Sequence, residues 1–447
     1  MPMSRLPRTP IIGVAVIAFL ALTACAGGGT GPATADTPSS GFKAGVLNKD
    51  YSGTTLQVAL PPWGQMPPAQ LGKFSSATGI KVSMQSLDFD ALHDKLVTAG
   101  AANQAVADVV EMDWSWVGQF GAAGWMTPLK DWLPASTISK AIGASAFNAK
   151  GNQIALPYSL DFRGSIVNMT LLKKAGIDTA PTTYAELIQA AQQLKAKGVT
   201  KYPVGLPLSI KEGTSTPWYA LVRAAGGSIL KANGDLEFKS SGIGAGALDL
   251  IHRLYSDGLI DKGSVGLSDT DVTNQFAAGQ SAILLSAGPG ALSTFADKKQ
   301  SKVSGDDVVL TPVPAASASN NRAAIGLEEG MGIPKASKAK AAAAMFIYWW
   351  TQQEQYATAY STPAMGLLPP NEQTLTSLVD SGKLLGGKAI VRIAKTIAPV
   401  IDGGAPVWYP KFSNTVASTV QSAAVGNESA QAGIDALVKQ VRALKNQ

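Results

Sequence analysis

The chain has 447 residues, of which 46% are hydrophobic and 15% are charged. This balance is typical of well-packed globular chains and excludes an intrinsically disordered protein. The formal net charge is +6, but Lys and Arg are scattered along the chain without a basic block, so the composition does not indicate nucleic-acid binding.

The first 24 residues are organised like a secretory signal peptide. Arg5 and Arg8 precede an apolar run over residues 11–22, which is shorter than the ~20 residues that a membrane-spanning helix needs. The only cysteine, Cys25, follows small residues in the arrangement of a bacterial lipoprotein signal. We therefore expect cleavage before Cys25, a lipid on its thiol and a flexible tether over residues 25–50. The protein would then lie at the extracytoplasmic face of the cell membrane.

A buried or catalytic role for Cys25 is the alternative interpretation. The chain has no second cysteine with which it could form a disulfide. The stability of the protein must therefore come from its hydrophobic core.

From residue 55 onward the sequence alternates between strand and helix patterns. Leu56, Val58 and Leu60 alternate with polar or small residues, which indicates a strand that ends at Pro61. Similar patterns predict strands over residues 80–84 and 107–112, and helices over residues 70–77, 90–103 and 116–123. This order favours a mostly parallel sheet with helices on both faces.

A second alternating stretch begins near residue 160. Its clearest local signal is a capping box, in which Thr183 and Glu186 open a helix that is followed by Gly198. Further strands are predicted over residues 165–169, 204–206, 281–286 and 308–312, and further helices over residues 218–225, 245–255, 341–350, 412–425 and 429–444.

Eight short segments carry a resemblance to a known family. They are FSSATGIKV at 74–82, ADVVEMD at 107–113, GAAGWMTPL at 121–129, LPY at 156–158, VNMTLLKKAGI at 167–177, PTTYAEL at 181–187, FAAGQSAI at 276–283 and GIPK at 332–335. In this order they resemble the carbohydrate-binding family of extracellular solute-binding proteins that serve ABC importers and that includes maltose-binding protein. Each motif is weak alone, but together they span most of residues 51–444.

The resemblance implies an α/β fold of two lobes, each a mostly parallel sheet flanked by helices, joined by hinge crossovers with the ligand between them. By analogy the N-lobe comprises residues 51–160 and 325–370, and the C-lobe comprises residues 161–324 and 371–447. The resemblance also implies a monomer that works with the permease subunits of an ABC transporter.

A sugar site needs flat aromatic rings for the apolar faces of the sugar and polar side chains for its hydroxyl groups. Trp63 follows the first predicted strand, and Asp113 and Trp114 follow the third, at the sheet edge where α/β proteins bind ligands. Loop packing is the alternative role for Trp63.

The remaining candidates are placed by the analogy or by their loops. Tyr158, Asp161 and Arg163 would line the cleft at the first crossover, although a structural salt bridge between Asp161 and Arg163 is an equal alternative. Adjacent carboxylates at the second crossover need solvent or a ligand. The candidates at that crossover and in later loops are Glu328, Glu329, Trp218, Trp408 and Tyr409.

The tryptophans at 125, 132, 349 and 350 are expected to be structural, and His93 and His252 are expected to be ordinary helix residues because neither has metal-ligand spacing. We expect no cofactor, no metal and no catalysis.

The sequence predicts a protein that binds a sugar or oligosaccharide and delivers it to a membrane permease. A non-sugar solute, such as a polyamine, an amino sugar or a glycerophosphodiester, is an alternative. A secreted glycoside hydrolase is a further alternative, because paired carboxylates could act as acid and base. No G-x-S-x-G or H-E-x-x-H motif accompanies those carboxylates.

Overall fold

The computed structural model describes residues 37–231, 236–240, 242–296, 298–299, 301–320, 322–352, 368–401 and 404–446. All of them belong to one compact unit, Thr34–Gln447. Cys25 and the signal segment lie outside these residues, so lipid attachment stays a prediction. Within the described ranges, no helix combines the length and apolar character that crossing a membrane requires.

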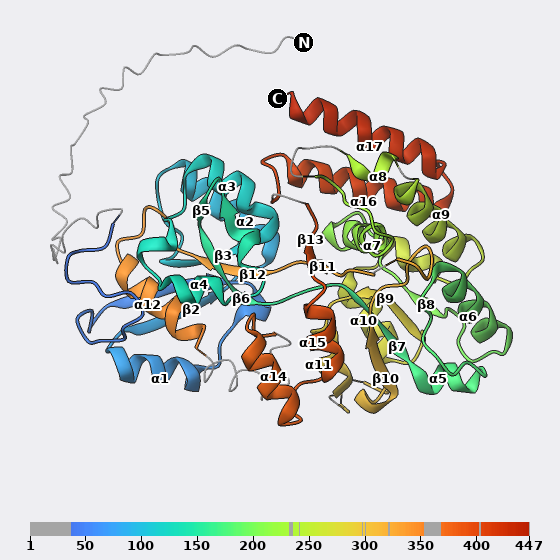
Figure 1. Cartoon of the computed structure of the whole chain (residues 1–447), viewed down its shortest axis with the longest axis horizontal. Coiled ribbons are helices and arrows are strands. Elements are labelled where there is room, and N and C mark those ends of the chain that lie inside the picture. The colour runs from blue at the N-terminus through green and yellow to red at the C-terminus, as the bar shows by residue number, and fades with distance from the viewer. Residues whose placement is uncertain are drawn as a thin grey trace, which may run out of the picture. The chain divides into compact units, whose positions relative to one another are not determined.

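The first sheet has five strands in the order β2-β1-β3-β12-β6 (Figure 1). Strands β1, β2, β3 and β6 all run in one direction, and only β12 is reversed. The strand bounds are β1 Thr55–Leu60, β2 Lys81–Ser86, β3 Val109–Asp113, β6 Ala155–Ser159 and β12 Glu329–Gly332. The helices of this region are α1 Pro68–Thr78, α2 Phe89–Ala101, α3 Val117–Ala123, α4 Ala135–Ser139 and α12 Lys340–Trp350, with a small hairpin of β4 Asn148–Ala149 and β5 Asn152–Gln153.

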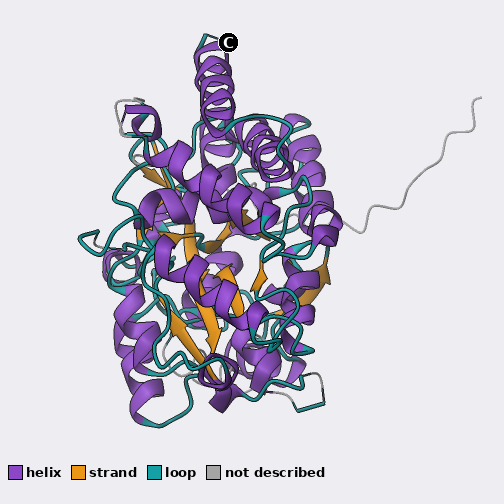
Figure 2. Cartoon of the chain, turned by 90° about the vertical axis from the view of Figure 1, so that its right-hand side faces the viewer, coloured by secondary structure: helices purple, strands orange, loops and turns teal. Residues whose placement is uncertain are grey.

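The second sheet has four strands in the order β10-β7-β9-β8, again with one reversed strand, β7. The bounds are β7 Gly164–Asn168, β8 Val204–Gly205, β9 Ile283–Ala287 and β10 Val308–Thr311. Its helices, purple in Figure 2, are α5 Met169–Lys174, α6 Tyr184–Ala196, α7 Glu212–Ala224, α8 Glu237–Ser240, α9 Ile243–Ser256, α10 Asp269–Ala277, α11 Ala291–Ala296, α14 Glu372–Asp380, α15 Lys388–Ala394, α16 Tyr409–Val425 and α17 Ala430–Lys445.

Both sheets bury side chains on two faces, as the alternating pattern of the sequence predicts. In β1, Leu56, Val58 and Leu60 belong to one apolar cluster, whereas Ala59 belongs to the cluster on the opposite face. The same alternation occurs in β9 of the second sheet, where neighbouring side chains belong to different clusters. The prediction of two mostly parallel sheets flanked by helices is therefore confirmed.

Two segments of the chain cross between the sheets. Residues 160–163 connect β6 to β7, and the short strand β11 (Ile325–Gly326) leads into β12. The two crossings lie side by side, because Arg163 N donates to Ile325 O at 3.1 Å and Leu327 N donates to Asp161 O at 3.0 Å. A third segment, β13 (Ala398–Pro399), pairs with β11. The exact lobe boundaries given above stay a prediction.

The tether is shorter than expected. Phe42 and Leu47 pack against the first apolar cluster, and the Phe42 ring lies 5.3 Å from that of Trp132. Burial of these two apolar side chains holds the segment against the core, so residues 42–50 are not a free tether.

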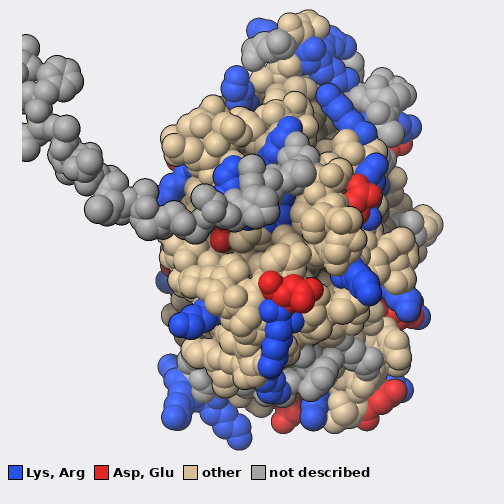
Figure 3. Space-filling view, turned by 90° about the vertical axis from the view of Figure 1, so that its left-hand side faces the viewer, with Lys and Arg blue, Asp and Glu red and all other residues tan. Residues whose placement is uncertain are grey.

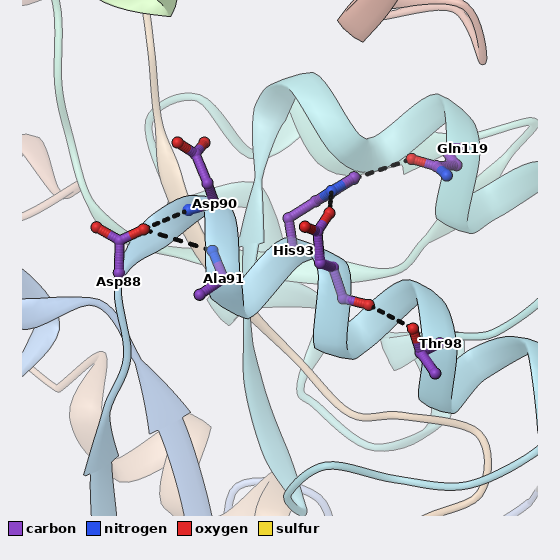
Figure 4. Close-up of polar contacts among 7 residues, drawn as sticks. Asp88, Asp90, Ala91, His93, Thr98 and Gln119 are labelled. Carbon is purple, nitrogen blue, oxygen red and sulfur yellow. Dashed lines mark hydrogen bonds and ion pairs between the residues drawn. The ribbon is translucent and has the colours of Figure 1, made fainter. Parts of the chain in front are cut away.

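Local signals for helix ends hold in the structure. Thr183 and Glu186 form the predicted capping box of α6. Asp88 caps α2 by accepting from Asp90 N and Ala91 N (Figure 4). His93 pairs with Gln119, with 3.1 Å between Nε2 and Oε1, as expected for an ordinary helix residue.

Candidate functional site

A central cavity of about 460 Å³ is formed by elements of both sheets. This volume is typical of small-molecule sites. The first sheet contributes the residues after β1, the end of β6 and the start of β12, while the second contributes β9, α10 and α11. The polar and aromatic residues of the lining are Trp63, Ser159, Asp161, Arg163, Asp269, Thr273, Ser286, Ser293 and Glu329.

The first crossover supplies an ion pair to this cavity. Arg163 Nη1 lies 2.5 Å from Asp161 Oδ2, and Asp161 Oδ1 accepts from Phe162 N at 2.8 Å. Burial acts to lower the pKa of Arg163, but the charges of Asp161, Asp269 and Glu329 outweigh it and raise that pKa. A Cβ atom at position 288 would lie 2.9 Å from the guanidinium, so Gly288 allows β9 to end against this pair.

A buried carboxyl pair lies beside the ion pair. Glu329 lines the cavity and forms a hydrogen bond with Glu111, which also accepts from the Tyr158 hydroxyl at 2.7 Å. Glu111 Oε1 and Glu329 Oε2 find no donor, and a proton shared between the two carboxyl groups would satisfy such atoms. Burial raises the pKa of Glu329 well above its usual value, and the charge of Glu111 adds to this.

Ser286 provides an unused hydroxyl group at the end of β9. The residue is 7% exposed, lines the cavity, and its Oγ has no hydrogen-bond partner. Its φ of +58° lies in the left-handed region, which is strained for a residue other than glycine. Sequence reasoning missed Ser286. Its position at the end of a predicted strand, two residues before Gly288, was a usable signal, because α/β proteins bind ligands at the carboxyl ends of their strands.

Asp269, which the sequence analysis also did not single out, begins α10 at the cavity rim and is exposed. Its neighbours Ser268 and Asp271 form a capping box that fixes the start of α10. A Cβ atom at position 213 would lie 2.5 Å from Asp269 Oδ1, so Gly213 gives this carboxylate its space.

Trp63 is the aromatic residue of the central cavity, as the sequence predicted. It lies in a short 3-10 helix, Pro62–Gly64, directly after β1, and is 39% exposed. Its ring is 5.9 Å from that of Phe89, which in turn lies 4.6 Å from Trp116. Phe89 and Trp116 line a neighbouring hollow of about 470 Å³.

Asp113, Trp114, Trp408 and Tyr409 lie outside the central cavity. Asp113 caps the turn after β3 by accepting from Ser115 N at 2.8 Å. Trp114 packs against Tyr409 with ring centroids 4.9 Å apart, and the Tyr409 hydroxyl donates to Glu212 at 2.6 Å. Trp408 packs edge-on against Phe412. Tyr409 lines the neighbouring hollow, so it could contact only a ligand that reaches that hollow.

Glu328 and Glu329 face different cavities because successive residues of an extended segment point in opposite directions. Glu328 lines a separate cavity of about 260 Å³ together with Trp114. Burial raises the pKa of Glu328 from 4.5 to about 8. A Cβ atom at Gly143 or Gly326 would lie within 2.3 Å of the Glu328 side chain, so both glycines are needed to accommodate it.

Two predicted site residues are wrong. Trp218 was expected on a loop, but α7 begins at Glu212 and places it fully buried, with its indole N–H donating to Gly244 O at 3.0 Å. Pro217 is the sixth residue of α7 and lies inside the helix. Tyr158 is fully buried beside Trp350 and contacts Glu111 instead of lining the cleft.

Trp132, Trp349 and Trp350 are buried, as expected of structural residues. His252 bonds the carbonyl oxygen of Ala423 at 3.0 Å, which agrees with its predicted ordinary role. Lys and Arg form separate groups among uncharged residues on the face shown in Figure 3.

Comparison with known proteins agrees with this architecture. A solute-binding protein of Agrobacterium radiobacter K84 in complex with ribitol superposes with a TM-score of 0.76 at 21% identity, covering 88% of this chain and 99% of that one. Maltose-bound MalE3 of T. maritima gives a TM-score of 0.76 at 20% identity, covering 88% and 100%. The predicted two-lobed fold of periplasmic binding proteins is therefore confirmed.

A curated relative adds evidence at the sequence level. A probable amino-acid ABC transporter periplasmic-binding protein of Sinorhizobium fredii is 25% identical over 331 residues, which are 70% of this chain and 72% of the relative. The sequence model of the bacterial extracellular solute-binding proteins matches residues 61–357. Because that match covers well over half of the sequence, the chain belongs to the bacterial extracellular solute-binding protein family.

Proposed function

We propose that this protein is the solute-binding component of an ABC importer, and that it captures a sugar or polyol in the central cavity and delivers it to the membrane permease. The observation that carries the proposal is the cavity itself, which is formed by both sheets beside the two crossings. A ligand there contacts both sheets at once, so its binding favours their closed arrangement.

The lining has the chemistry that a polyhydroxylated solute needs. Trp63 offers an exposed ring for an apolar C–H face. Asp161, Arg163 and Glu329 offer charged partners for hydroxyl groups, and Ser286 offers a further hydrogen bond. Hydrogen bonds to charged groups contribute roughly 1.5–3 kcal/mol each, so a few of them reach the ~8 kcal/mol of micromolar affinity.

The two solved relatives reported above were captured with ribitol and with maltose, a polyol and a sugar. Maltose is larger than ribitol, and a ligand of that size would extend beyond the central cavity past Trp63. The neighbouring hollow, which Phe89 and Trp116 line, would hold the part that extends. The proposal includes release of the solute without chemical change. Hydrolysis of a glycosidic bond by this protein would instead support the alternative of a glycoside hydrolase.

The cellular setting of the proposal follows from the N-terminal signal. Cleavage before Cys25 and lipid attachment would hold the protein, as a monomer, at the extracytoplasmic face of the membrane beside the permease. Cys25→Ser should move the protein from the membrane fraction to the soluble fraction. Retention of that variant in the membrane fraction would contradict lipid anchoring.

Isothermal titration calorimetry with a panel of sugars and polyols, including ribitol and maltose, tests the solute class. A ligand at about 100 times its Kd should also stabilise the protein by ~2.7 kcal/mol in thermal unfolding. Product analysis after long incubation accompanies each titration. Stoichiometric binding with unchanged solute supports the proposal, whereas turnover, or no binding across the panel, contradicts it.

A further inference from the structure

We propose that the solute of the central cavity carries a protonated amine, so that it belongs to the class of amino sugars or amino alditols. This inference rests on the proposed function, because it names the charge of the polyhydroxylated solute that the same cavity would hold.

The charges of the cavity are unbalanced. Asp161, Asp269 and Glu329 line it from the first crossover, α10 and β12, and Arg163 is the cation among the described lining residues. Arg163 already pairs with Asp161 at 2.5 Å. Even if Glu111 and Glu329 are both neutral, Asp161 and Asp269 place two carboxylates against this one guanidinium, so the described lining keeps a net negative charge.

Further carboxyl groups lie behind the lining. Asp113 and Glu111 belong to the same strand, β3, and Glu111 is fully buried. Glu212 begins α7 and is followed by Gly213, where a side chain would clash with Asp269. Buried carboxylates without cations are unfavourable, and a cationic ligand would let Glu329 ionise at lower free-energy cost.

Ser286 is a second and independent indication that a ligand binds here. Its hydroxyl is buried at the cavity wall, lacks a partner and is held by a strained backbone. Buried polar groups are normally paired, and strained residues cluster at binding sites. Nearby Ser159, Thr273 and Ser293 also line the cavity. A hydroxyl or ammonium group of the solute would complete the hydrogen bonding of Ser286.

An organic cation fits this arrangement better than a metal ion. Within the described residues, no group of three His, Cys, Asp or Glu side chains is arranged to hold a metal. The cavity of about 460 Å³ is far larger than an ion requires. Its exposed Trp63 ring can also contact the body of an ammonium-bearing solute through a cation–π interaction.

The test compares solutes that differ only in one amine. Calorimetry at pH 7 is performed with D-sorbitol against 1-amino-1-deoxy-D-sorbitol and with D-glucose against D-glucosamine, at equal ionic strength. We expect the amino member of at least one pair to bind at least tenfold more tightly than its neutral partner. Equal affinity within both pairs, or tighter binding of the neutral member, overturns the inference and leaves the proposed function intact.

Variants show whether the carboxylates cause the preference. Asp269→Asn and Glu329→Gln should each reduce the preference for the amine at least threefold, with less effect on the neutral partner. Glu328→Gln is the matched control, since this neighbouring carboxyl group lines a different cavity, and it should leave the preference unchanged. An unchanged preference in both cavity variants overturns the inference.

Titration across the wider sugar and polyol panel separates the two proposals. If no polyhydroxylated solute binds, neutral or cationic, the proposed function fails and this inference fails with it. If neutral polyols bind and amines do not, only the charge assignment fails. Circular dichroism of each variant confirms that a lost preference does not come from unfolding.

Discussion

The two walls of the central cavity differ in what they present to a ligand. The wall of the first sheet and the crossover carries Trp63, Asp161, Arg163 and Glu329. The wall of the second sheet includes four small residues, Ala287, Gly288, Gly290 and Ala291, and its polar members are Asp269, Thr273, Ser286 and Ser293. One wall therefore supplies an aromatic platform and most of the charge, and the other supplies a close surface.

Trp63 has no aromatic counterpart among the described residues of the second wall, and Trp218, a predicted site residue, lies in the core instead. Trp218 stabilises the core beneath the second sheet, where it packs against Phe238 at 5.3 Å. Small residues at the end of β9 allow the second wall to approach the ion pair closely. The following changes test how far the two walls differ.

The largest effect is expected for Trp218→Ala. Removing this fully buried ring should lower the free energy of unfolding by about 3–5 kcal/mol, because it leaves a cavity in the core. Urea denaturation measures the loss. Trp63→Ala, at the central cavity, is the matched control and should change the free energy of unfolding by less than about 0.5 kcal/mol. Equal stability of the two variants would contradict the division of roles.

Asp161→Asn should weaken binding of the cognate solute about a hundredfold, or ~2.7 kcal/mol. The substitution removes an acceptor at the cavity and leaves Arg163 without its ion-pair partner. Calorimetry with the tightest ligand of the panel measures the effect. An affinity within twofold of the wild type would show that the ion pair is structural only, which is the alternative that the sequence left open.

Trp63→Ala should weaken binding about tenfold, or ~1.4 kcal/mol, while Trp63→Phe should keep part of the affinity. The exposed ring has no hydrogen-bonding role in this prediction, so any flat aromatic residue should substitute partially. Calorimetry with the same ligand provides the comparison. If phenylalanine and alanine lose the same affinity, stacking is not the role of Trp63.

The smallest effect is expected for Glu328, behind the cavity. Burial raises the pKa of Glu328 from 4.5 to about 8. Between pH 4.5 and about 8, Glu328 therefore keeps its proton in the folded protein and loses it in the unfolded chain. Raising the pH from 5 to 8 should therefore destabilise the wild type through this group. Asp161 and Asp113 also raise its pKa.

Glu328→Gln should reduce that pH dependence and be more stable than the wild type at pH 8 by about 1 kcal/mol or more. At pH 4.5 and below, the difference between the two proteins should be small. Thermal unfolding at pH 5 and pH 8 measures the difference. An identical decline in both proteins would show that Glu328 does not keep its proton in the folded state.

Periodicity and caps in the sequence were enough to place most strands and helices, because alternating apolar residues in β1 and the capping box of α6 act locally. The sequence did not reveal that Glu329 begins a strand between β3 and β6, since that pairing joins distant segments. Nor could the residue pattern show that α7 starts at Glu212 and continues through Pro217, because proline normally interrupts a helix interior.

Within the site, the position after a strand correctly placed Trp63 at the cavity. The same rule predicted that Asp113 and Trp114 would line the ligand site, but neither residue belongs to the lining of the central cavity. Which of two adjacent residues faces a cavity depends on the backbone direction at that point, and this separates Glu328 from Glu329. Ser286, near the end of β9, is distinguished by its burial and by the missing hydrogen-bond partner of its hydroxyl group.

The reversed strand β12 has a consequence for the order in which the protein can fold. Strand β6 ends at Ser159 and pairs only with β12 in its sheet, and β12 begins at Glu329. A nascent chain must therefore wait for about 170 further residues before the first sheet can close. Until Glu329 has emerged, β6 has an unpaired edge and Glu111 lacks its buried partner, so a shorter nascent chain cannot complete its ligand-binding face.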